Sequence, residues 1–333
     1  MNRNERIRQS QNYKNGVFQN ISPTPVMAGN VSFFSVLQQS VTRPSSVRPS
    51  KRLPNQKTDL VNINPETPTI TWFGHSSYLI QMSGTNILVD PVFSGHASPL
   101  SFLIKAFPGA EIYSEEDLPE IDMLILTHNH YDHFDAKTIT RLKQKTRYYY
   151  TALGVGNDLE KLGIAEKQVT EFDWWESRSV SNDIKLTATP ARHFSGRGLK
   201  RGGSLWTSFV LQLFGYTIFI GGDSGYDSHF KTIGEKFGVF DLAILECGQY
   251  NTSWPFIHMM PEQTVQASVD LSAKWLMPVH WAKFTLANHP WNEPVERAAK
   301  KAAELNVKLT TPMIGEPVVI NGNYPVHRWW VGY

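Results

Sequence analysis

Short apolar runs, separated by polar turns, recur along most of the chain and predict its secondary structure. Runs of roughly four to eight residues that are apolar, or that alternate between apolar and polar side chains, are typical of strands. The first three runs follow one another with no helix between them, which indicates antiparallel pairing early in the fold. We predict strands at residues 69–73, 77–82, 86–89, 121–126, 183–190, 216–222, 241–246 and 275–279.

Helical signals separate the later strands. Pro261 fits a first helical position, and Glu262 in the first turn interacts favourably with the helix dipole. Helices are predicted near residues 136–145, 227–237, 261–271 and 293–305. Strands that first follow one another and then alternate with helices indicate an α/β protein.

The composition is typical of a soluble protein with ample material for a core. The 333 residues, 41% of them hydrophobic, are enough for one large or two ordinary domains. The ten tryptophans either fill the core or line a lipid-facing groove. No run of about 20 apolar residues occurs, and no apolar segment follows the charged start, so neither a spanning helix nor a secretory signal is expected. Cytoplasmic localisation is the default expectation.

Cys247 is the only cysteine and follows a buried-strand pattern, so we expect an inert core thiol and no intramolecular disulfide.

The first 62 residues differ from the rest in charge. Up to Leu60 they contain nine Lys or Arg and two acidic residues, a net charge of +7, whereas the whole chain carries +2, which leaves −5 for the remainder. This polar segment, most basic at residues 43–52, is typical of an extended arm with little core of its own. We therefore divide the chain into an N-terminal extension, 1–62, and a main domain, 63–333. The extension either wraps the domain or is attracted to an acidic membrane surface. Nucleic acid is a less expected partner, because the basic run lacks the glycine-aromatic context of RNA-binding motifs.

Four side chains that can bind metal lie within six residues, directly after the strand predicted at 121–126. They are His128, His130, Asp132 and His133. A histidine-rich exposed turn is the alternative interpretation of any one of them. Six adjacent residues crowd a single tetrahedral ion, so the spacing suits two neighbouring ions better.

Further candidate ligands lie where other predicted strands end. His193 follows the strand at 183–190, Asp223 follows a glycine pair after 216–222, and His280 follows 275–279. Asp90 occupies the equivalent place after 86–89. Strand ends that lead into loops are the usual place for site chemistry, so we group these residues with the histidine-rich run.

The order of these residues resembles the metallo-β-lactamase superfamily, with its strand-end Asp, His-x-His-x-Asp-His, His, Asp and His. Within it, the chain is most similar to the N-acylphosphatidylethanolamine-hydrolysing phospholipase D branch. The runs that carry this similarity lie at 72–76, 127–135, 173–176, 222–226, 258–262 and 280–288. The resemblance covers about residues 69–305. It implies a four-layer α-β-β-α sandwich with metals in loops along one edge of two sheets, and makes 63–333 the catalytic domain.

The resemblance implies two Zn²⁺ per chain. One would be held by His128, His130 and His193, the other by Asp132, His133 and His280, and Asp223 would bridge them. Asp132 is also assigned as catalytic. His75 and Asp90 would fix the orientation of the imidazole rings by hydrogen bonds; the alternatives are a packed histidine and a turn aspartate.

His258 is outside the superfamily's ligand set. In the phospholipase branch a histidine at this place acts near the substrate phosphate, where it could protonate the leaving alcohol or stabilise charge. A role in capping or packing before the helix at Pro261 is the alternative.

The function implied is a zinc phosphodiesterase of phospholipase D type that releases N-acylethanolamine and phosphatidic acid from N-acylphosphatidylethanolamine. The alternatives are a metal-dependent hydrolase of another phosphoester or lactone, and a membrane-associated lipid-binding scaffold with a structural metal site. The apolar segment 93–107 favours a lipid or membrane partner if exposed, and means only packing if buried. The branch includes homodimers, so a homodimer is a further expectation.

Overall fold

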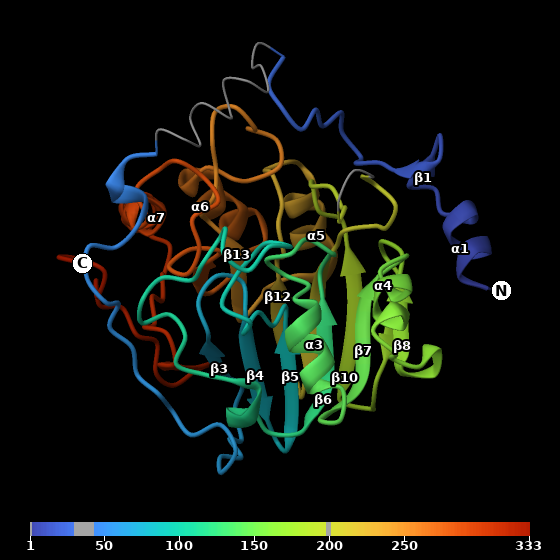
Figure 1. Ribbon diagram of the computed structural model, residues 1–333, viewed down its shortest axis with the longest axis horizontal. Coiled ribbons are helices and arrows are strands. Elements are labelled where there is room, and N and C mark those ends of the chain that lie inside the picture. The colour runs from blue at the N-terminus through green and yellow to red at the C-terminus, as the bar shows by residue number, and fades with distance from the viewer. Residues whose placement is uncertain (1, 30–42, 198–200) are drawn as a thin grey trace.

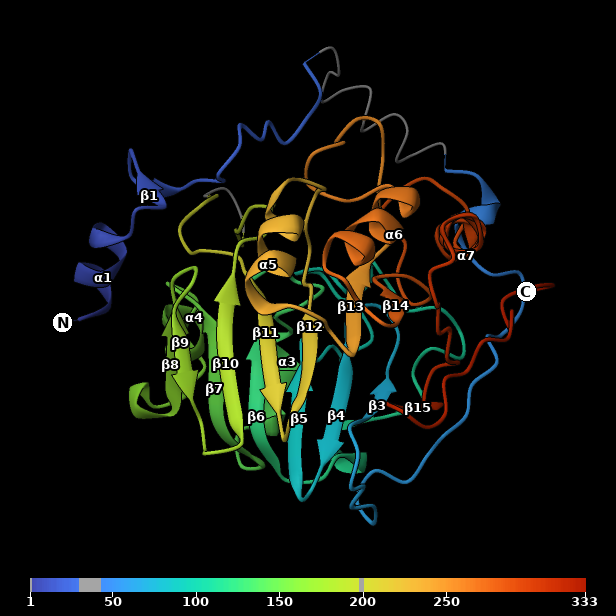
Figure 2. The same ribbon diagram turned by 180° about the vertical axis from the view of Figure 1, so that it is seen from behind.

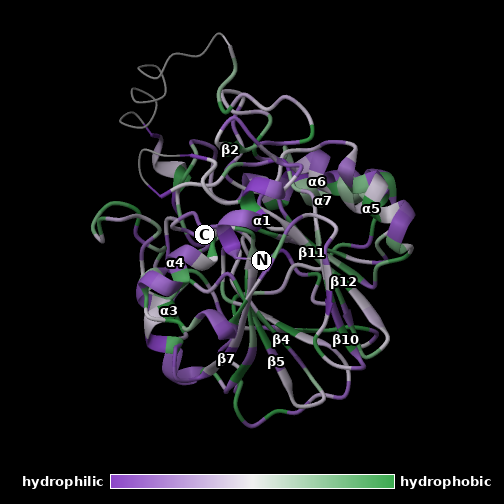
Figure 3. Cartoon of the chain, turned by 90° about the vertical axis from the view of Figure 1, so that its right-hand side faces the viewer, coloured by the Kyte–Doolittle hydropathy of each residue, from purple (hydrophilic) through white to green (hydrophobic). Residues whose placement is uncertain are grey.

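The computed structural model describes residues 2–29, 43–197 and 201–333, and within them two β-sheets lie face to face between layers of helices (Figure 1). Figure 3 shows the helices on the two outer sides of the sheets. One sheet is covered by α3 (Ala136–Leu142) and α4 (Gly156–Lys161), and the other by α5 (His229–Phe237), α6 (Pro261–Asp270) and α7 (Glu293–Leu305). This is the four-layer α-β-β-α sandwich expected from the resemblance, so the predicted fold class is confirmed.

Each of the two large sheets has an antiparallel part and a parallel part. The first has seven strands in the order β15 (Pro317–Val319), β3 (Thr69–Trp72), β4 (Tyr78–Met82), β5 (Thr85–Val89), β6 (Ile121–Leu126), β7 (Thr146–Ala152) and β8 (Val169–Phe172). The second has six strands in the order β14 (Leu276–Val279), β13 (Leu242–Glu246), β12 (Tyr216–Ile220), β11 (Ser208–Leu213), β10 (Ile184–Thr189) and β9 (Ser177–Ser179). Pairing is parallel from β5 to β8 and from β12 to β14, and antiparallel elsewhere.

Three apolar layers hold the four structural layers together. Along β6, Ile125 faces the other sheet, whereas Leu124 faces α3 and packs in the same cluster as Ile139. On the second sheet, Ile218 lies in the layer between the sheets and Phe219 lies in the layer under the helices. Both faces of these strands are buried, which explains why their sequences are continuous apolar runs.

The N-terminal arm, defined here as residues 2–29, lies along the domain (Figure 2). It contains α1 (Arg3–Gln9) and the short hairpin β1 (Tyr13–Lys14) and β2 (Val17–Phe18). Arg3 forms ion pairs with Glu160 and Glu171, and Arg6 with Glu176. The arm therefore wraps the domain, as one interpretation of its sequence expected. The division at residue 62 stays a prediction, and residues 1 and 30–42 of the extension lie outside the described part.

The burial of Cys247 and of most tryptophans agrees with the interpretation that they are core residues. Cys247 is buried, and burial raises the pKa of its thiol, as expected for an inert core thiol. Seven of the ten tryptophans are buried, which favours the core interpretation for Trp72, Trp174, Trp206, Trp281, Trp291, Trp329 and Trp330. No helix among the described residues combines the length and apolar character needed to cross a membrane.

The segment 93–107 has packed flanks and an exposed tip, so the packing interpretation and the lipid-contact interpretation each fit one part of it. Its flanks are packed: Ala97 and Phe107 are buried, and Ala97 N donates to Ile104 O at 2.9 Å. The tip is exposed, with 51% of Leu100, 66% of Phe102 and 54% of Leu103 accessible to solvent. The packing interpretation therefore holds for the flanks and is wrong for the tip.

Candidate metal centre

Strand ends bring the candidate ligands to one edge of the two sheets. Asp90 follows β5, the run 128–133 follows β6, Asp223 follows β12 and His280 follows β14. His193 comes four residues after the end of β10. Loops beyond the carboxyl ends of strands are where α/β proteins commonly bind ligands. The structure assembles all seven predicted metal ligands here, in two donor clusters.

The first donor cluster consists of His128, His130, His193 and Asp223. His130 Nδ1 lies 3.0 Å from His128 Nε2 and 3.2 Å from His193 Nε2. Asp223 Oδ2 lies 3.7 Å from the Nε2 atoms of His128 and His193. A tetrahedral zinc ion about 2.0–2.1 Å from each nitrogen would hold the nitrogens about 3.3 Å apart, so these spacings suit one small cation.

The second donor cluster consists of His75, Asp132, His133 and His280, all buried. His75 Nε2 donates to Asp132 Oδ2 at 2.9 Å. Asp223 Oδ1 lies 3.1 Å from His133 Nε2 and 3.2 Å from His280 Nδ1. Since Oδ2 of the same carboxylate faces the first cluster, Asp223 lies between the two, where a bridging ligand would be.

A further layer of hydrogen bonds fixes the imidazole rings. His133 Nδ1 donates to Asp90 Oδ2 at 2.7 Å, and Asp90 also accepts from the backbone N–H and the hydroxyl of Thr127. His193 Nδ1 donates to the carbonyl of Ile257 at 2.8 Å. Because Nδ1 is used in this way, Nε2 of each ring is directed to the clusters. Asp90 thus makes the predicted kind of hydrogen bond to an imidazole, whereas His75 bonds the carboxylate of Asp132 and is itself one of the grouped donors.

Three of these residues have unusual backbone conformations. His75, Asp90 and His280 have φ angles of 54°, 42° and 69°, in the left-handed region that side chains other than glycine rarely adopt. Such strain, of the order of 1–3 kcal/mol per residue, persists only where the surrounding structure enforces it and concentrates at functional sites. The fold therefore holds this edge in a geometry that its local sequence does not favour.

The two donor clusters suit a cation because some of their nitrogen and oxygen atoms have unused lone pairs and because their surroundings favour a positive charge. His133 Nε2, His280 Nε2 and Asp223 Oδ1 are buried and have no hydrogen-bond partner among the described residues. Burial holds the pKa of His128 well below its usual value, which keeps its ring neutral and able to donate a lone pair. Burial would also lower the pKa of His133, but Asp223, Asp132 and Asp90 outweigh it and raise that pKa well above its usual value. The surroundings of His133 therefore favour a positive charge, which a metal ion would supply.

His258 lies against both clusters without belonging to either. Its ring stacks on His280 with centroids 5.2 Å apart, and its centroid is 5.1 Å from that of His193. Its side chain does not cap α6, because the backbone N–H of Met260 is bound by Gln263 Oε1 at 2.9 Å. The described side-chain hydrogen bond of His258 goes to Glu246 and not to α6, and a role near the substrate stays a prediction.

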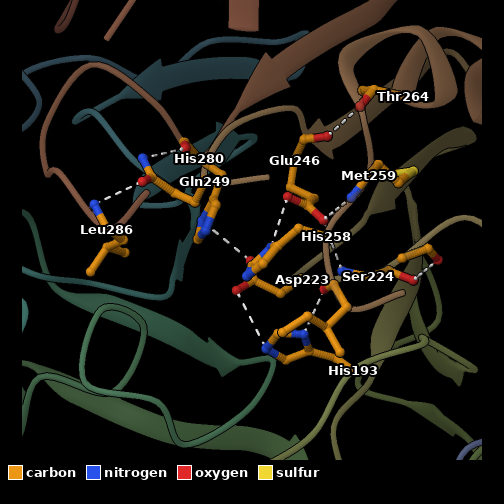
Figure 4. A network of polar contacts seen from close by, with 12 residues as sticks. His193, Asp223, Ser224, Glu246, Gln249, His258, Met259, Thr264, His280 and Leu286 are labelled. Carbon is orange, nitrogen blue, oxygen red and sulfur yellow. Dashed lines mark hydrogen bonds and ion pairs between the residues drawn. The ribbon is translucent and has the colours of Figure 1, made fainter. Parts of the chain in front are cut away.

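Glu246, at the end of β13, is a buried residue of this site that sequence reasoning missed (Figure 4). Its Oε2 lies 3.1 Å from His258 Nδ1, and its Oε1 accepts from the backbone N–H groups of Ser224 and Met259. Burial lowers the pKa of His258, but Glu246 outweighs it and raises that pKa to about 9. The sequence does contain one signal for Glu246: like Asp90, it is a carboxylate at the end of a predicted strand. Together with Asp223 and His280, this pair forms a third group of possible donors.

Comparisons with known proteins agree with this geometry. A family model described as a β-lactamase superfamily domain matches residues 85–281. An uncharacterized protein of Mycobacterium tuberculosis is 36% identical over 97% of this chain and 88% of its own length. The N-acyl-phosphatidylethanolamine-hydrolyzing phospholipase D 1 of Caenorhabditis elegans is 32% identical over 65% of this chain and 64% of its own length.

The fold is shared with solved structures of low sequence identity. A metallo hydrolase of the archaeon Ignicoccus hospitalis aligns with a TM-score of 0.57 and 21% identity, over 76% of this chain and 97% of that one. At this identity the likeness shows the arrangement of layers and strands alone.

Proposed function

Because this chain belongs to the β-lactamase superfamily, we propose that it is a binuclear zinc phosphodiesterase of the phospholipase D type, which hydrolyses N-acylphosphatidylethanolamine to N-acylethanolamine and phosphatidic acid. A metal-dependent hydrolase of this superfamily is the coarser conclusion, which the family match and the buried His/Asp clusters support. The single observation that carries the finer proposal is the placement of His258 beside two donor clusters with Asp223 between them.

The donor set suits two Zn²⁺ ions. His128, His130 and His193 would hold one ion, and Asp132, His133 and His280 the other, with Asp223 shared. When bound, zinc supplies Lewis acidity, which stabilises charge on phosphoryl oxygens and makes water nucleophilic near neutral pH.

His258 then has a defined task. Its Nδ1 is bound to Glu246, which leaves Nε2 to donate a proton to the oxygen of the leaving alcohol as the P–O bond breaks. Glu246 fixes the ring orientation through Nδ1 and is itself fixed by two backbone N–H groups. Asp132, a proposed ligand bound to His75, would hold its metal ion close to the reacting phosphate.

The exposed tip of the 93–107 segment supports a peripheral membrane contact as part of this function. Leu100, Phe102 and Leu103 form an apolar projection beside Lys105. An apolar tip with a neighbouring cation suits the boundary of an anionic bilayer.

The experiment is a turnover screen of metal-analysed protein against N-acylphosphatidylethanolamine, bis-p-nitrophenyl phosphate and a simple lactone, with products identified by mass spectrometry. We expect about two zinc ions per chain and release of N-acylethanolamine with phosphatidic acid. Turnover of the lactone alone, or of the activated diester but not the lipid, would replace the proposal with another metallohydrolase activity. No turnover at full metal content would favour the lipid-binding scaffold.

A further inference from the structure

A cavity of about 390 Å³ lies between the N-terminal arm and the loops that follow β10. This size is within the range of roughly 300–1,000 Å³ that small-molecule sites have. The arm supplies lining residues between Val17 and Val26, and the opposite side includes His193 and Phe194. His193 is therefore both a candidate metal ligand and part of the cavity lining.

Asn20 fixes the arm as a wall of this cavity. Its Nδ2 donates to His193 O at 2.7 Å, and its Oδ1 accepts from His193 N and from Trp206 Nε1, each at 3.0 Å. Nearby, Phe18 N donates to Gly202 O at 2.8 Å. The wall is thus hydrogen-bonded to the opposite side of the cavity and to the backbone of a candidate ligand.

Several polar groups of the lining are already bound within the protein. Thr24 Oγ1 donates to Ser22 O at 2.8 Å and accepts from Arg192 Nε at 3.0 Å. Gln19 Nε2 donates to Lys14 O at 3.2 Å. The surface left for a ligand is therefore mainly apolar. It comes from Val17, Phe18, Pro23, Val26, Phe194 and Trp206.

Phe194 joins the cavity to the metal centre. Its ring contacts the ring of His130 edge to face, with centroids 4.6 Å apart, and lies 4.9 Å from the ring of His193. The guanidinium of Arg201, another lining residue, lies 4.9 Å from the centre of the same phenyl ring. An apolar cavity with one cation, adjacent to a cation-binding edge, has the charge and polarity that suit an anionic amphiphile.

We propose that this cavity binds a hydrocarbon chain of the substrate while the phosphodiester lies at the donor clusters, so that the N-terminal arm sets a preference for chain length. The inference rests on the proposed phosphodiesterase function for its orientation, but the binding of a chain can be measured separately.

The test uses metal-loaded protein and a series of alkyl p-nitrophenyl phosphates with methyl, butyl and octyl groups, which share one leaving group. We expect kcat/KM to rise about fourfold for each methylene that enters the cavity. Val26→Trp fills the cavity and should lower the octyl-to-methyl ratio of kcat/KM at least tenfold. Val326→Trp, at a residue 64% exposed and outside the cavity lining, is the matched control and should keep the ratio.

A ratio that does not rise with chain length, or that is equal in wild type and Val26→Trp, overturns the proposal. If Val26→Trp does not fold, Val17→Trp on the same wall takes its place. If no diester is hydrolysed, the proposed function has failed. Calorimetric titration with decanoate and acetate then tests whether the cavity binds a hydrocarbon chain. Tighter binding of decanoate that Val26→Trp abolishes supports the chain site, whereas equal binding of both acids overturns it.

Discussion

Asp223 is the residue on which both donor clusters depend. Burial alone would raise its pKa, but His133, His280 and His258 outweigh burial and hold the pKa well below its usual value, so the carboxylate is charged. Asp223→Ala removes that charge from between the clusters. We expect loss of bound metal, measured by elemental analysis, and a fall in turnover of several orders of magnitude. Asp183→Ala, at an exposed carboxylate, is the control and should change neither. Near-normal turnover with full metal content in Asp223→Ala would show that the ligand assignment is wrong.

His258→Ala separates proton transfer from metal binding. Both metal ions should be retained, because the proposed ligands are unchanged, while the rate on a lipid alcohol falls roughly 10²–10⁴-fold. The loss should be smaller with bis-p-nitrophenyl phosphate, whose leaving group needs no proton. Glu246→Gln keeps the shape but removes the charge, and should give a smaller loss with altered pH dependence of kcat. Equal losses on both substrates would point to phosphate positioning by His258 instead of proton donation.

The buried Lys283 should make the free energy of unfolding depend on pH. Its ammonium is buried and donates to the carbonyls of Phe73 and Val92, and burial lowers its pKa to about 8 from a usual value of 10.5. Between these values the unfolded chain binds more protons than the folded chain, so the free energy of unfolding rises with pH. Comparison with Lys283→Met by urea unfolding at pH 7.5 to 10.5 should show this rise, up to about 3 kcal/mol, in the wild type only. The same rise in Lys283→Met would assign it to other groups; Lys300→Met, at an exposed lysine, should behave as the wild type.

At the residue scale, the seven candidate ligands could be singled out because metal chemistry restricts residue type, order and spacing together, and the structure places all seven close to one another. Asn20 carried no such signal, since an asparagine in a polar arm has many uses and its contact with His193 spans 173 residues. Thr127 and Ser76 were likewise recognisable only once the rings of His128 and His280 were placed beside their hydroxyls.

At the element scale, the exposed tip of the 93–107 segment makes membrane contact testable. Leu100→Ser with Phe102→Ser removes two large apolar side chains, each worth about 1.5–3 kcal/mol when buried. We expect binding to vesicles with anionic lipid, measured by sedimentation, to weaken at least tenfold, with turnover of a soluble diester kept. Val239→Ser, at an exposed residue at the end of α5, is the control. Unchanged binding of the double variant would remove this tip from the membrane contact.

The eight predicted strands all exist, and their ends agree within two residues because buried runs and turn residues mark them clearly. The helix expected to reach residue 145 ends at Leu142, where the backbone N–H of Lys145 donates to Leu142 O at 3.0 Å in the turn that leads into β7. Among the described helices and strands, α1, α4, β1, β2, β7, β8, β9, β11 and β15 were not predicted. β9 and β15 have three residues each, too few for periodicity to appear.

At the scale of the whole molecule, the clusters join the two sheets across their shared edge. Metal ions that bind only the folded state stabilise it by mass action, about 4 kcal/mol at 1,000 times Kd. Chelation should therefore lower the melting temperature by roughly 6 °C for a protein of this size, measured by calorimetry with and without added zinc. An unchanged melting temperature after removal of the metals would mean that the sheets meet without their help.

The layered architecture could not be derived from periodicity. Local patterns identified strands and helices, but the partition into two sheets of seven and six strands depends on contacts between distant parts of the chain, such as β15 with β3. Only the resemblance to a known family supplied it in advance.

The hydrogen bonds of Asn20 have a consequence for how the protein is made. The arm is translated before its partner His193, which follows Asn20 by 173 residues, a delay of roughly 10–35 seconds at ordinary elongation rates. The Asn20 contacts can form only after that interval, so docking of the arm is a late event in assembly of the candidate metal centre. A fusion partner attached ahead of the arm would therefore act on maturation of the enzyme, not merely on its solubility or purification.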